Sequence, residues 1–377
     1  MFDFINILDK RFLLIFILLS LYNCQQESLE PLKKLEISEA QEKFLDLDSE
    51  TSNINNFYQY IETDSAEILA FFNSLNYKLY LYNLESKKLI SSIPFEKDGP
   101  NALGNRITYF HYAHDDSIVF HSYYKGELLV FNHKGKNKGQ IPVKAESLDF
   151  EFQPKSGAGF PPVRISDFVY INTGASCNFD NSGQKQAIYK RNLVDGSSEL
   201  NLKFPIEYSK EKDSYWPQEL CNPYNTYNAN NNIMVVSFPL SDSVLTINEN
   251  GQRRAFSFSS PEFQKKNALR KNQLTGNPLD EFKHLLSYPR YGAIFYDPVR
   301  KIYLRKFYLE TSRENLDKNI FKTQMKMLVA NESFEILGEF DYQGGDHIFF
   351  NQKGLNEVVF NSKLQDSLKI KTVSYAF

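Results

Sequence analysis

The chain has 377 residues with a formal net charge of -3; 42% of its residues are hydrophobic and 24% are charged. This balance excludes an intrinsically disordered chain, and the small charge without a basic stripe argues against nucleic acid as a partner. Aromatic residues reach 15%, mostly Tyr and Phe, and such side chains pack well on pleated sheets. The composition therefore predicts a folded, β-rich protein.

The N-terminal residues have the pattern of an export signal. Lys10 and Arg11 precede an apolar run over residues 12–19, and Cys24 follows shortly after it. The run is about half as long as a helix that spans a bilayer. The segment resembles a bacterial lipoprotein signal in which Cys24 becomes the acylated N-terminus, although Tyr22 and Asn23 replace the usual small residues. The alternatives are an ordinary signal peptide or a short anchor helix, and each places the mature domain outside the cytoplasm.

The segment between the signal and the first sheet is charged and tether-like. In residues 33–37, Leu35 and Ile37 share one face, which predicts an outer strand that could close a ring of sheets. Residues 38–47 are expected to form a short helix.

Strand–turn–strand units then recur along the chain. In the first unit, residues 78–83 and 88–95 alternate in side-chain character on either side of a polar turn, with two more strands expected at 58–61 and 67–73. Asp195-Gly196 is a strong hairpin signal in the third unit. The other units cover residues 107–143, 188–204, 244–258, 325–340 and 347–373.

Six such units predict an all-β fold, a β-propeller with short helical insertions, because radial repetition of four-stranded sheets protects their faces and edges. Six blades are expected, or seven if the N-terminal segment completes a sheet of its own. A pair of β-sandwiches is the rival, and it should show shorter and more uniform segments. The predicted organisation is a signal peptide over 1–23, a lipid-anchored tether and closure strand over 24–56, and the propeller over 57–377.

Three stretches depart from the repeat. Residues 153–162 are rich in Gly and Pro, and residues 205–232 are long, polar and aromatic. Residues 260–287 predict two helices, because Ser260 and Asn277 each place a cap residue before a proline. Residues 312–321 predict one more short helix. Long insertions in compact domains are often functional.

Two motifs resemble a known family. Asp98-Gly99-Pro100-Asn101 closes the first unit, and YPRYGAIFYDP over 288–298 is followed by KIYLR over 301–305. Together with the signal and the repeat, these motifs resemble the six-bladed-propeller lipoproteins of the family called domain of unknown function 4221. The resemblance covers most of the mature chain. It implies the fold and an envelope location, and it implies no activity.

Few residues form a pattern that indicates chemistry. His111, His114, Asp115 and Asp116 invite a metal hypothesis, but strand residues three apart point to opposite faces and the aspartates fall at a turn. A structural turn is therefore favoured, and no G-x-S-x-G or phosphate-loop motif is present in the sequence. We expect no catalytic residue, no metal and no cofactor.

The cysteine count fits export. Lipidation of Cys24 leaves Cys177 and Cys221, which exported domains often join. A bridge would close a loop of about 45 residues and contribute about 4 kcal/mol in the chain-entropy model. Two independent buried thiols are the alternative.

The loops around a central channel are the expected ligand site. Aromatic rings with an arginine suit a sugar or peptide, whereas the alternative is that these rings pack blade junctions. The candidate ligand-binding residues are Tyr215, Trp216, His284, Tyr288, Arg290, Tyr291 and His347.

We therefore expect a monomeric envelope protein, anchored to the membrane by its N-terminal lipid, that acts as a non-catalytic binding or scaffold module. Its partners would be envelope proteins, a peptide or a glycan. The alternative is a propeller-type hydrolase or lyase that acts on glycans or lactones at the mouth of the channel. Three or more titratable side chains at one mouth would favour the enzyme, and a mouth lined by backbone and apolar groups would exclude it.

Overall fold

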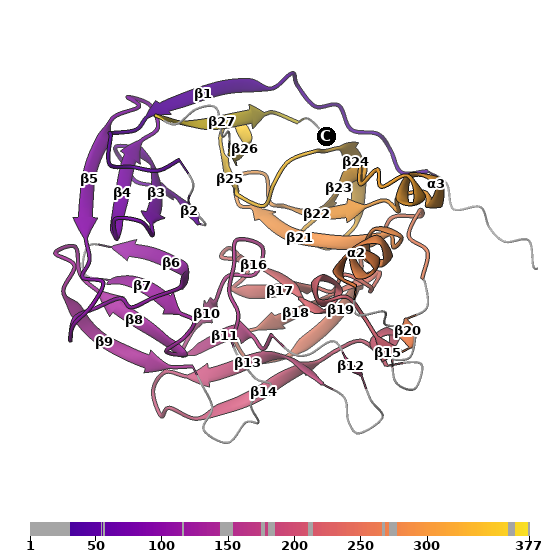
Figure 1. Cartoon of the computed structure of the whole chain (residues 1–377), viewed down its shortest axis with the longest axis horizontal. Helices are drawn as coiled ribbons and strands as arrows, with labels where there is room; N and C mark the ends of the chain where they lie inside the picture. The colour runs from indigo at the N-terminus through magenta and orange to yellow at the C-terminus, as the bar shows by residue number, and fades with distance from the viewer. Residues whose placement is uncertain are drawn as a thin grey trace, which may run out of the picture. The chain divides into compact units, whose positions relative to one another are not determined.

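The computed structural model describes residues 31–53, 55, 57–114, 117–143, 154–174, 178–179, 185–209, 214–265, 268–270, 277–360 and 366–375. The chain divides into two units, Met1–Leu32 and Lys33–Phe377. In the described part of the second unit, six four-stranded antiparallel sheets follow one another around a centre (Figure 1). The predicted β-propeller is confirmed, and its number of blades is six.

The four strands of each blade are ordered from the centre of the ring outward. Blade 1 contains β2 (Tyr58–Glu62), β3 (Glu67–Asn73), β4 (Lys78–Asn83) and β5 (Leu89–Pro94). Blade 2 contains β6 (Ile107–His114), β7 (Ser117–Ser122), β8 (Glu127–Phe131) and β9 (Asn137–Pro142). Blade 3 contains β10 (Val163–Ile165), β11 (Phe168–Asn172), β13 (Gln186–Asn192) and β14 (Ser198–Lys203).

Blade 4 contains β16 (Tyr224–Asn228), β17 (Ile233–Ser237), β18 (Ser243–Asn248) and β19 (Arg253–Ser257). Blade 5 contains β21 (Arg290–Asp297), β22 (Ile302–Tyr308), β23 (Met325–Asn331) and β24 (Ile336–Asp341). Blade 6 contains β25 (Ile348–Asn351), β26 (Gly354–Val359), β27 (Ser367–Val373) and, as its outer strand, the N-terminal β1 (Gln41–Asp46).

The local sequence explains the hairpins and the core. At the turn between β13 and β14, Gly196 has a φ of +73°, which a glycine adopts without strain. The middle strands of the blades are buried on both faces because a neighbouring sheet lies on each side. In β3, for example, the five residues Leu69–Asn73 are all buried.

The N-terminal segment closes the ring, but with a different strand from the one expected. β1 pairs with β27 from Gln41↔Thr372 to Asp46↔Ser367, so the predicted helix over 38–47 is wrong. The predicted strand over 33–37 makes only the isolated bridges Lys34↔Glu339 and Ile37↔Tyr375 among the described pairs. Pairing with the open edge of β27 and full burial of Leu45 outweigh the weak helix preference of this segment.

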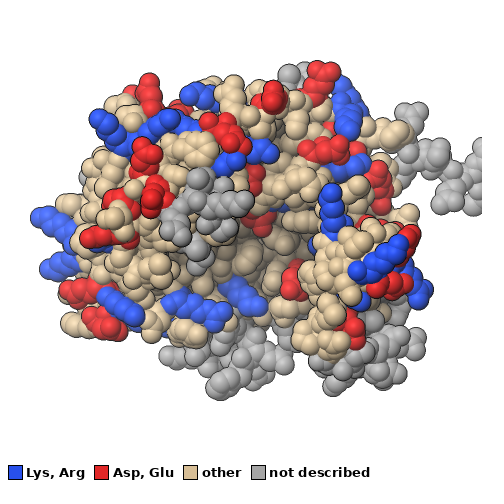
Figure 2. Space-filling view, turned by 45° about the horizontal axis from the view of Figure 1, so that its top comes forward, with Lys and Arg blue, Asp and Glu red and all other residues tan. Residues whose placement is uncertain are grey.

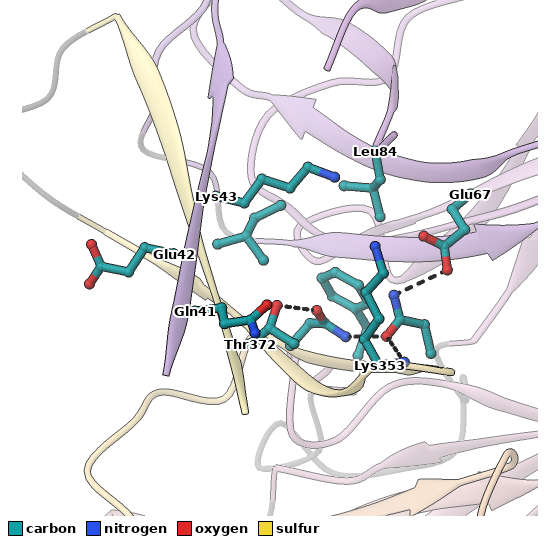
Figure 3. A pocket seen from close by; sticks show the side chains of 11 residues that line it. Gln41, Glu42, Lys43, Glu67, Leu84, Lys353 and Thr372 are labelled. Carbon is teal, nitrogen blue, oxygen red and sulfur yellow. Dashed lines mark hydrogen bonds between the residues drawn. The ribbon is translucent and has the colours of Figure 1, made fainter. Parts of the chain in front are cut away.

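A polar pocket of about 100 Å³ marks the ring closure (Figure 3). Beside it, Thr372 Oγ1 donates to Asn356 Oδ1 at 2.7 Å, and Asn356 Nδ2 donates to Asn351 Oδ1 at 2.9 Å. Asn351 Nδ2 then donates to Glu67 Oε1 of blade 1 at 3.1 Å. This chain of hydrogen bonds links the last blade to the first.

The insertions of blades 3 to 5 pair with one another. β12 (Asn178–Phe179), β15 (Ser214–Tyr215) and β20 (Leu269–Arg270) lie in three successive long connections and form a small three-stranded sheet. The two 3-10 helices Ile206–Tyr208 and Gln218–Cys221 flank β15. No local pattern in the sequence predicts this sheet.

The helical insertions are confirmed in part. α2 (Pro278–Leu286) begins after Asn277, whose side chain accepts a hydrogen bond from Leu279 N, and it buries Leu285 and Leu286. α3 (Arg313–Asp317) follows the cap residue Ser312. No helix follows Ser260, where the described residues form a turn, so that prediction is wrong.

The described helices are all too short, or too polar, to cross a membrane. On the face drawn in Figure 2, lysine and arginine side chains are interspersed with aspartate and glutamate side chains. This mixture matches the small net charge of the sequence.

Candidate functional site

The innermost strands of the blades all begin at one mouth of the ring. β2, β6, β10, β16, β21 and β25 are the inner strands of their blades (Figure 1), and in blades 1 to 5 each is the first strand of its blade in the chain. At blades 4, 5 and 6, the residues at or just before the strand beginnings are Tyr224, Arg290 and His347. We use the term channel mouth for these three residues together with Lys306, Tyr308 and Asp346.

Arg290 brings a positive charge to the channel mouth. It opens β21 and pairs with Tyr308, and its guanidinium carbon lies 4.6 Å from the centre of the Tyr308 ring. Its Nη1 donates two long hydrogen bonds, to the carbonyls of Leu285 at 3.5 Å and Tyr288 at 3.4 Å. Burial lowers the pKa of Arg290 from its ordinary value. The group remains a cation at neutral pH, because arginine is not deprotonated in proteins.

Lys306 brings a second cation, which is buried and has an acceptor for each of its three N–H donors. Its ammonium donates to the carbonyl of Gly344 at 3.1 Å, to the carbonyl of Gly345 and to the carboxylate of Asp346 at 2.6 Å. Burial lowers the pKa of Lys306, and Asp346 opposes this effect. The three donors of the ammonium fix the segment before β25 and compensate the charge of Asp346.

The same segment requires glycine. A side chain at Gly344 would collide with the carboxylate of Glu357 and the hydroxyl of Tyr342. The carboxylate of Glu357 also accepts a hydrogen bond from Gly345 N at 2.5 Å. The sequence therefore builds a tight turn directly in front of His347.

A cavity of about 430 Å³ lies between blades 2 and 3, and we call it the inter-blade cavity. The inner strands β6, β10 and β16 each contribute to its lining, so it borders the centre of the ring. Its polar lining residues are Tyr109, His111, Ser117, Arg164 and Tyr227; its apolar lining residues are Ala113, Val119, Leu128, Val130, Ile141, Pro161, Pro162, Val163, Val169 and Leu193.

The short strand β10 explains the inter-blade cavity. β10 spans the three residues Val163–Ile165, whereas β6 of the neighbouring blade spans the eight residues Ile107–His114. Pro161 and Pro162 precede β10 and lack the N–H groups that would extend its pairing. Part of the face of blade 2 is therefore left without a covering strand.

His111, one of the residues of the metal hypothesis, lines this cavity. Tyr109, His111 and Ala113 alternate along β6 and all line the cavity. Solvent reaches the His111 ring, while the surrounding protein lowers the pKa of its imidazole. His114 pairs with Ser117 across the hairpin, and Asp115 and Asp116 lie outside the described residues. The described residues contain no group of three or more His, Cys, Asp or Glu side chains suited to a metal ion.

Comparison with known proteins identifies the family. The family described as Domain of unknown function (DUF4221) matches residues 34–341 of this chain. The chain belongs to this family. The family inferred from the sequence is thereby confirmed, while lipoprotein status stays a prediction. DUF4221 carries no assigned activity in its description.

Two solved structures share the fold of this DUF4221 protein. A DUF4221 family member from Bacteroides vulgatus has a TM-score of 0.75 at 16% identity, over 91% of this chain and 99% of that chain. A protein from Bacteroides fragilis, whose name describes it as exported, has a TM-score of 0.56 at 11% identity, over 92% and 98% of the two chains. Identities this low show a common fold alone. No curated protein matches the sequence.

Several predicted ligand residues lie together in one aromatic cluster of this DUF4221 propeller. The Trp216 and Tyr288 rings are 5.6 Å apart and both are buried, and the His284 ring is 4.6 Å from Tyr288. Trp216 Nε1 donates to the carbonyl of Tyr208 at 3.1 Å. The adjoining cavity of about 20 Å³ has room for about one water molecule. The hydroxyl of Tyr215 donates to Glu281 at 3.3 Å.

Tyr291 is buried at the junction of blades 4 and 5. Its ring lies 3.6 Å from the guanidinium carbon of Arg305, and its hydroxyl accepts a hydrogen bond from Ser260 N at 3.0 Å. Arg305 is 0% exposed and donates to Ser237 Oγ at 2.9 Å, to the carbonyl of Ser241 at 2.8 Å and to further carbonyls. The pair ties β22 to blade 4.

His347 lies apart from the aromatic cluster, at the channel mouth. Its ring meets the Tyr58 ring edge-on at 5.1 Å, and its buried Nδ1 has no hydrogen-bond partner within the described part of the chain. Arg290 also belongs to the channel mouth. The structure therefore divides the seven predicted residues between a buried cluster, a blade junction and the channel mouth, and their binding role stays a prediction.

The cysteine predictions fall largely outside the described residues. Cys24 and Cys177 are not among them, and Cys221 is buried at the end of a 3-10 helix. Lipidation and the Cys177–Cys221 bridge stay predictions. Intact mass before and after reduction would test the bridge.

Sequence reasoning missed Tyr224, Lys306, Tyr308 and Asp346. Each lies at or near an end of an innermost hairpin, a position that is recognised only after every unit has been assigned its inner strand. The first residue of an inner strand is therefore the signal that would have found Tyr224 together with Arg290.

Proposed function

We propose that this DUF4221 protein is an exported, lipid-anchored β-propeller that acts as a non-catalytic binding module. The inter-blade cavity carries the proposal, because its volume is that of a small-molecule site and three blades build its walls. Its apolar walls suit an apolar or aromatic part of a ligand. His111, Arg164 and Tyr227 offer polar contacts to the rest of that ligand.

Two observations support an extracytoplasmic location. Lys10 and Arg11 precede an apolar run, and Cys24 follows that run. A protein of the same fold from Bacteroides fragilis is described as exported. In cells given an acyl-chain analogue, the wild-type protein should take up the label and Cys24→Ala should not. Label on Cys24→Ala would contradict lipid anchoring at this residue.

The cavity is tested with the fluorescent probe 8-anilinonaphthalene-1-sulfonate, which joins an aromatic body to an anionic group. The wild type should bind it saturably. Ala113 is exposed and lines the cavity, so Ala113→Trp should fill the space and weaken binding about tenfold or more. Leu89→Trp, at an exposed strand position in blade 1, is the matched control and should bind as the wild type does. Equal binding by both variants would exclude the cavity.

A second candidate function is a hydrolase or lyase that acts on glycans or lactones. The observation that favours it is the group of titratable side chains at the channel mouth, which includes Arg290, Asp346 and His347. Turnover of nitrophenyl glycosides or of a simple lactone would support this function if Asp346→Asn abolished it. Turnover that persisted in Asp346→Asn would place the chemistry elsewhere.

A further inference from the structure

Arg290 has unused hydrogen-bonding capacity. A guanidinium group has five N–H donors, and the described contacts of Arg290 use only Nη1, in two long hydrogen bonds to backbone carbonyls. No carboxylate of a described residue lies within ion-pair distance of it. The guanidinium is nevertheless half-buried, and a cation in that position is stabilised by an anion.

Two tyrosines, Tyr308 and Tyr224, interact electrostatically with this cation. Tyr308 pairs with Arg290 across the inner hairpin of blade 5, and Tyr224 opens the adjacent inner strand of blade 4. Neither hydroxyl has a hydrogen-bond partner among the residues that the structure describes. Both groups are protonated at neutral pH and can donate, since burial raises the pKa of Tyr308 to about 12 and also raises that of Tyr224.

The nearby charges leave the positive charge of Arg290 in place. Asp346 is the acidic group that influences both tyrosines, and its carboxylate is held by Lys306 at 2.6 Å. Glu219 also interacts electrostatically with Arg290, but it is an exposed side chain and its field is screened by water. The channel mouth therefore presents one uncompensated cation with two neutral donors.

We propose that Arg290, Tyr224 and Tyr308 bind a carboxylate group of a ligand at the channel mouth. A planar carboxylate matches the edge of a guanidinium group, and the Tyr308 ring occupies one face of that group. A phosphate dianion fits less well, because one cation would face two negative charges and Asp346 lies nearby. This site shares no residue with the inter-blade cavity and does not depend on its proposed role.

Carboxylates of this kind come from acidic sugars or from the C-termini of peptides. The probes are D-glucuronate and N-acetyl-Ala-Ala, each paired with its carboxamide, glucuronamide or N-acetyl-Ala-Ala-amide. Titration calorimetry on the full mature protein should detect at least one carboxylate with a Kd below about 10 mM and about tenfold weaker binding of its amide. The probe that binds identifies the source.

Separate variants test the contribution of the Arg290 charge and of the two tyrosine hydroxyls to binding. Arg290→Gln should lower the affinity about tenfold or more, and Tyr224→Phe and Tyr308→Phe should each lower it several-fold. Arg106→Gln is the matched control, because Arg106 also lies over a tyrosine ring, with its guanidinium carbon 4.4 Å from the centre of Tyr123. It should bind as the wild type does.

Three results would overturn the proposal: neither carboxylate binds, an amide binds as tightly as its acid, or Arg290→Gln keeps wild-type affinity. The tyrosine variants retain the ring packing, so they decide the question if Arg290→Gln fails to fold. Wild-type affinity in both tyrosine variants would then count against the site. Binding of 8-anilinonaphthalene-1-sulfonate to the inter-blade cavity is measured separately, so failure of one proposal leaves the other standing.

Discussion

Two blade junctions of this propeller solve the same packing problem in opposite ways. Between blades 4 and 5, the buried Arg305 donates to a hydroxyl and to several carbonyls while its guanidinium lies on Tyr291. Between blades 2 and 3, the buried His121 bonds Ser156 Oγ through Nδ1 at 2.6 Å, but its Nε2 has no partner within the described part of the chain. The inter-blade cavity adjoins this second junction.

The difference between the two junctions indicates why the inter-blade cavity is present. A junction that must only hold two blades together fills its space and satisfies its buried polar atoms. The junction of blades 2 and 3 leaves about 430 Å³ open and one buried ring nitrogen unpaired among the described residues. Unfilled space of this size costs stability, so a binding role accounts for its presence better than a packing role does.

The largest expected effect comes from replacing Arg305 at the junction of blades 4 and 5, which we call the filled junction. Arg305→Met leaves the buried carbonyls of Phe238 and Ser241 without their donor and should lower the free energy of unfolding by about 3–5 kcal/mol. Urea denaturation measures this change. Arg164→Met, at an exposed position of β10, is the control and should change it by less than about 0.5 kcal/mol. Equal effects would refute the role assigned to Arg305.

The junction of blades 2 and 3, which we call the open junction, should make the unfolding free energy depend on pH. Burial lowers the pKa of His121 from 6.5 to about 4, so the unfolded chain takes up the proton at a higher pH than the folded chain does. The stabilisation is therefore complete above about pH 6.5 and is lost as the pH falls towards 4, by up to about 3 kcal/mol. Denaturation curves recorded between pH 7.5 and about pH 4.5 give the unfolding free energy at each pH. This free energy should depend less on pH in His121→Asn than in the wild type, and an equal pH dependence would contradict the assignment.

A smaller effect is expected from one hydroxyl of the filled junction. Tyr291→Phe removes the acceptor of Ser260 N but keeps the ring on Arg305, so it should cost about 1 kcal/mol of unfolding free energy. Tyr124→Phe, on a ring that is 68% exposed, should cost almost nothing. A difference near zero between the two variants would show that the Ser260 contact is dispensable.

The smallest effect is expected for one methyl group added at the inter-blade cavity, and the comparison is the same addition at a filled interior position. Val119→Ile places the methyl in the inter-blade cavity and should change the unfolding free energy by less than about 1 kcal/mol. Val329 is 0% exposed in the filled interior of blade 5, so Val329→Ile should cost about 1–3 kcal/mol through overpacking. If Val119→Ile were the more costly variant, the cavity would not be open space.

The local sequence was sufficient to predict the hairpins. The turn at Asp195-Gly196 and the alternation around residues 78–95 report the structure of a few consecutive residues, and both appear in the fold. A helix was expected over residues 38–47, whereas β1 within this range pairs with β27, which lies far away in the sequence. Long-range pairing overrode local preference there.

The candidate site depends on the same kind of distant information. Arg290 was expected at a ligand site from its aromatic neighbourhood, but Tyr308 joins it through the pairing of β21 with β22, and Tyr224 joins it from the neighbouring blade 4. The inter-blade cavity arises from a mismatch between β6 and β10, and no single segment carries that mismatch. Local patterns therefore reveal blades better than they reveal the spaces between them.

The closing strand also sets an order of events during synthesis. Because Gln41 pairs with Thr372, blade 6 lacks its outer strand until β27 has been made. The first five blades consist of consecutive segments and can form as they emerge, while β1 must wait with its edge unpaired. Pairing between strands so far apart in the sequence forms slowly. The ring should therefore close in the final folding step, and a chain cut short before β27 should remain an open, aggregation-prone arc.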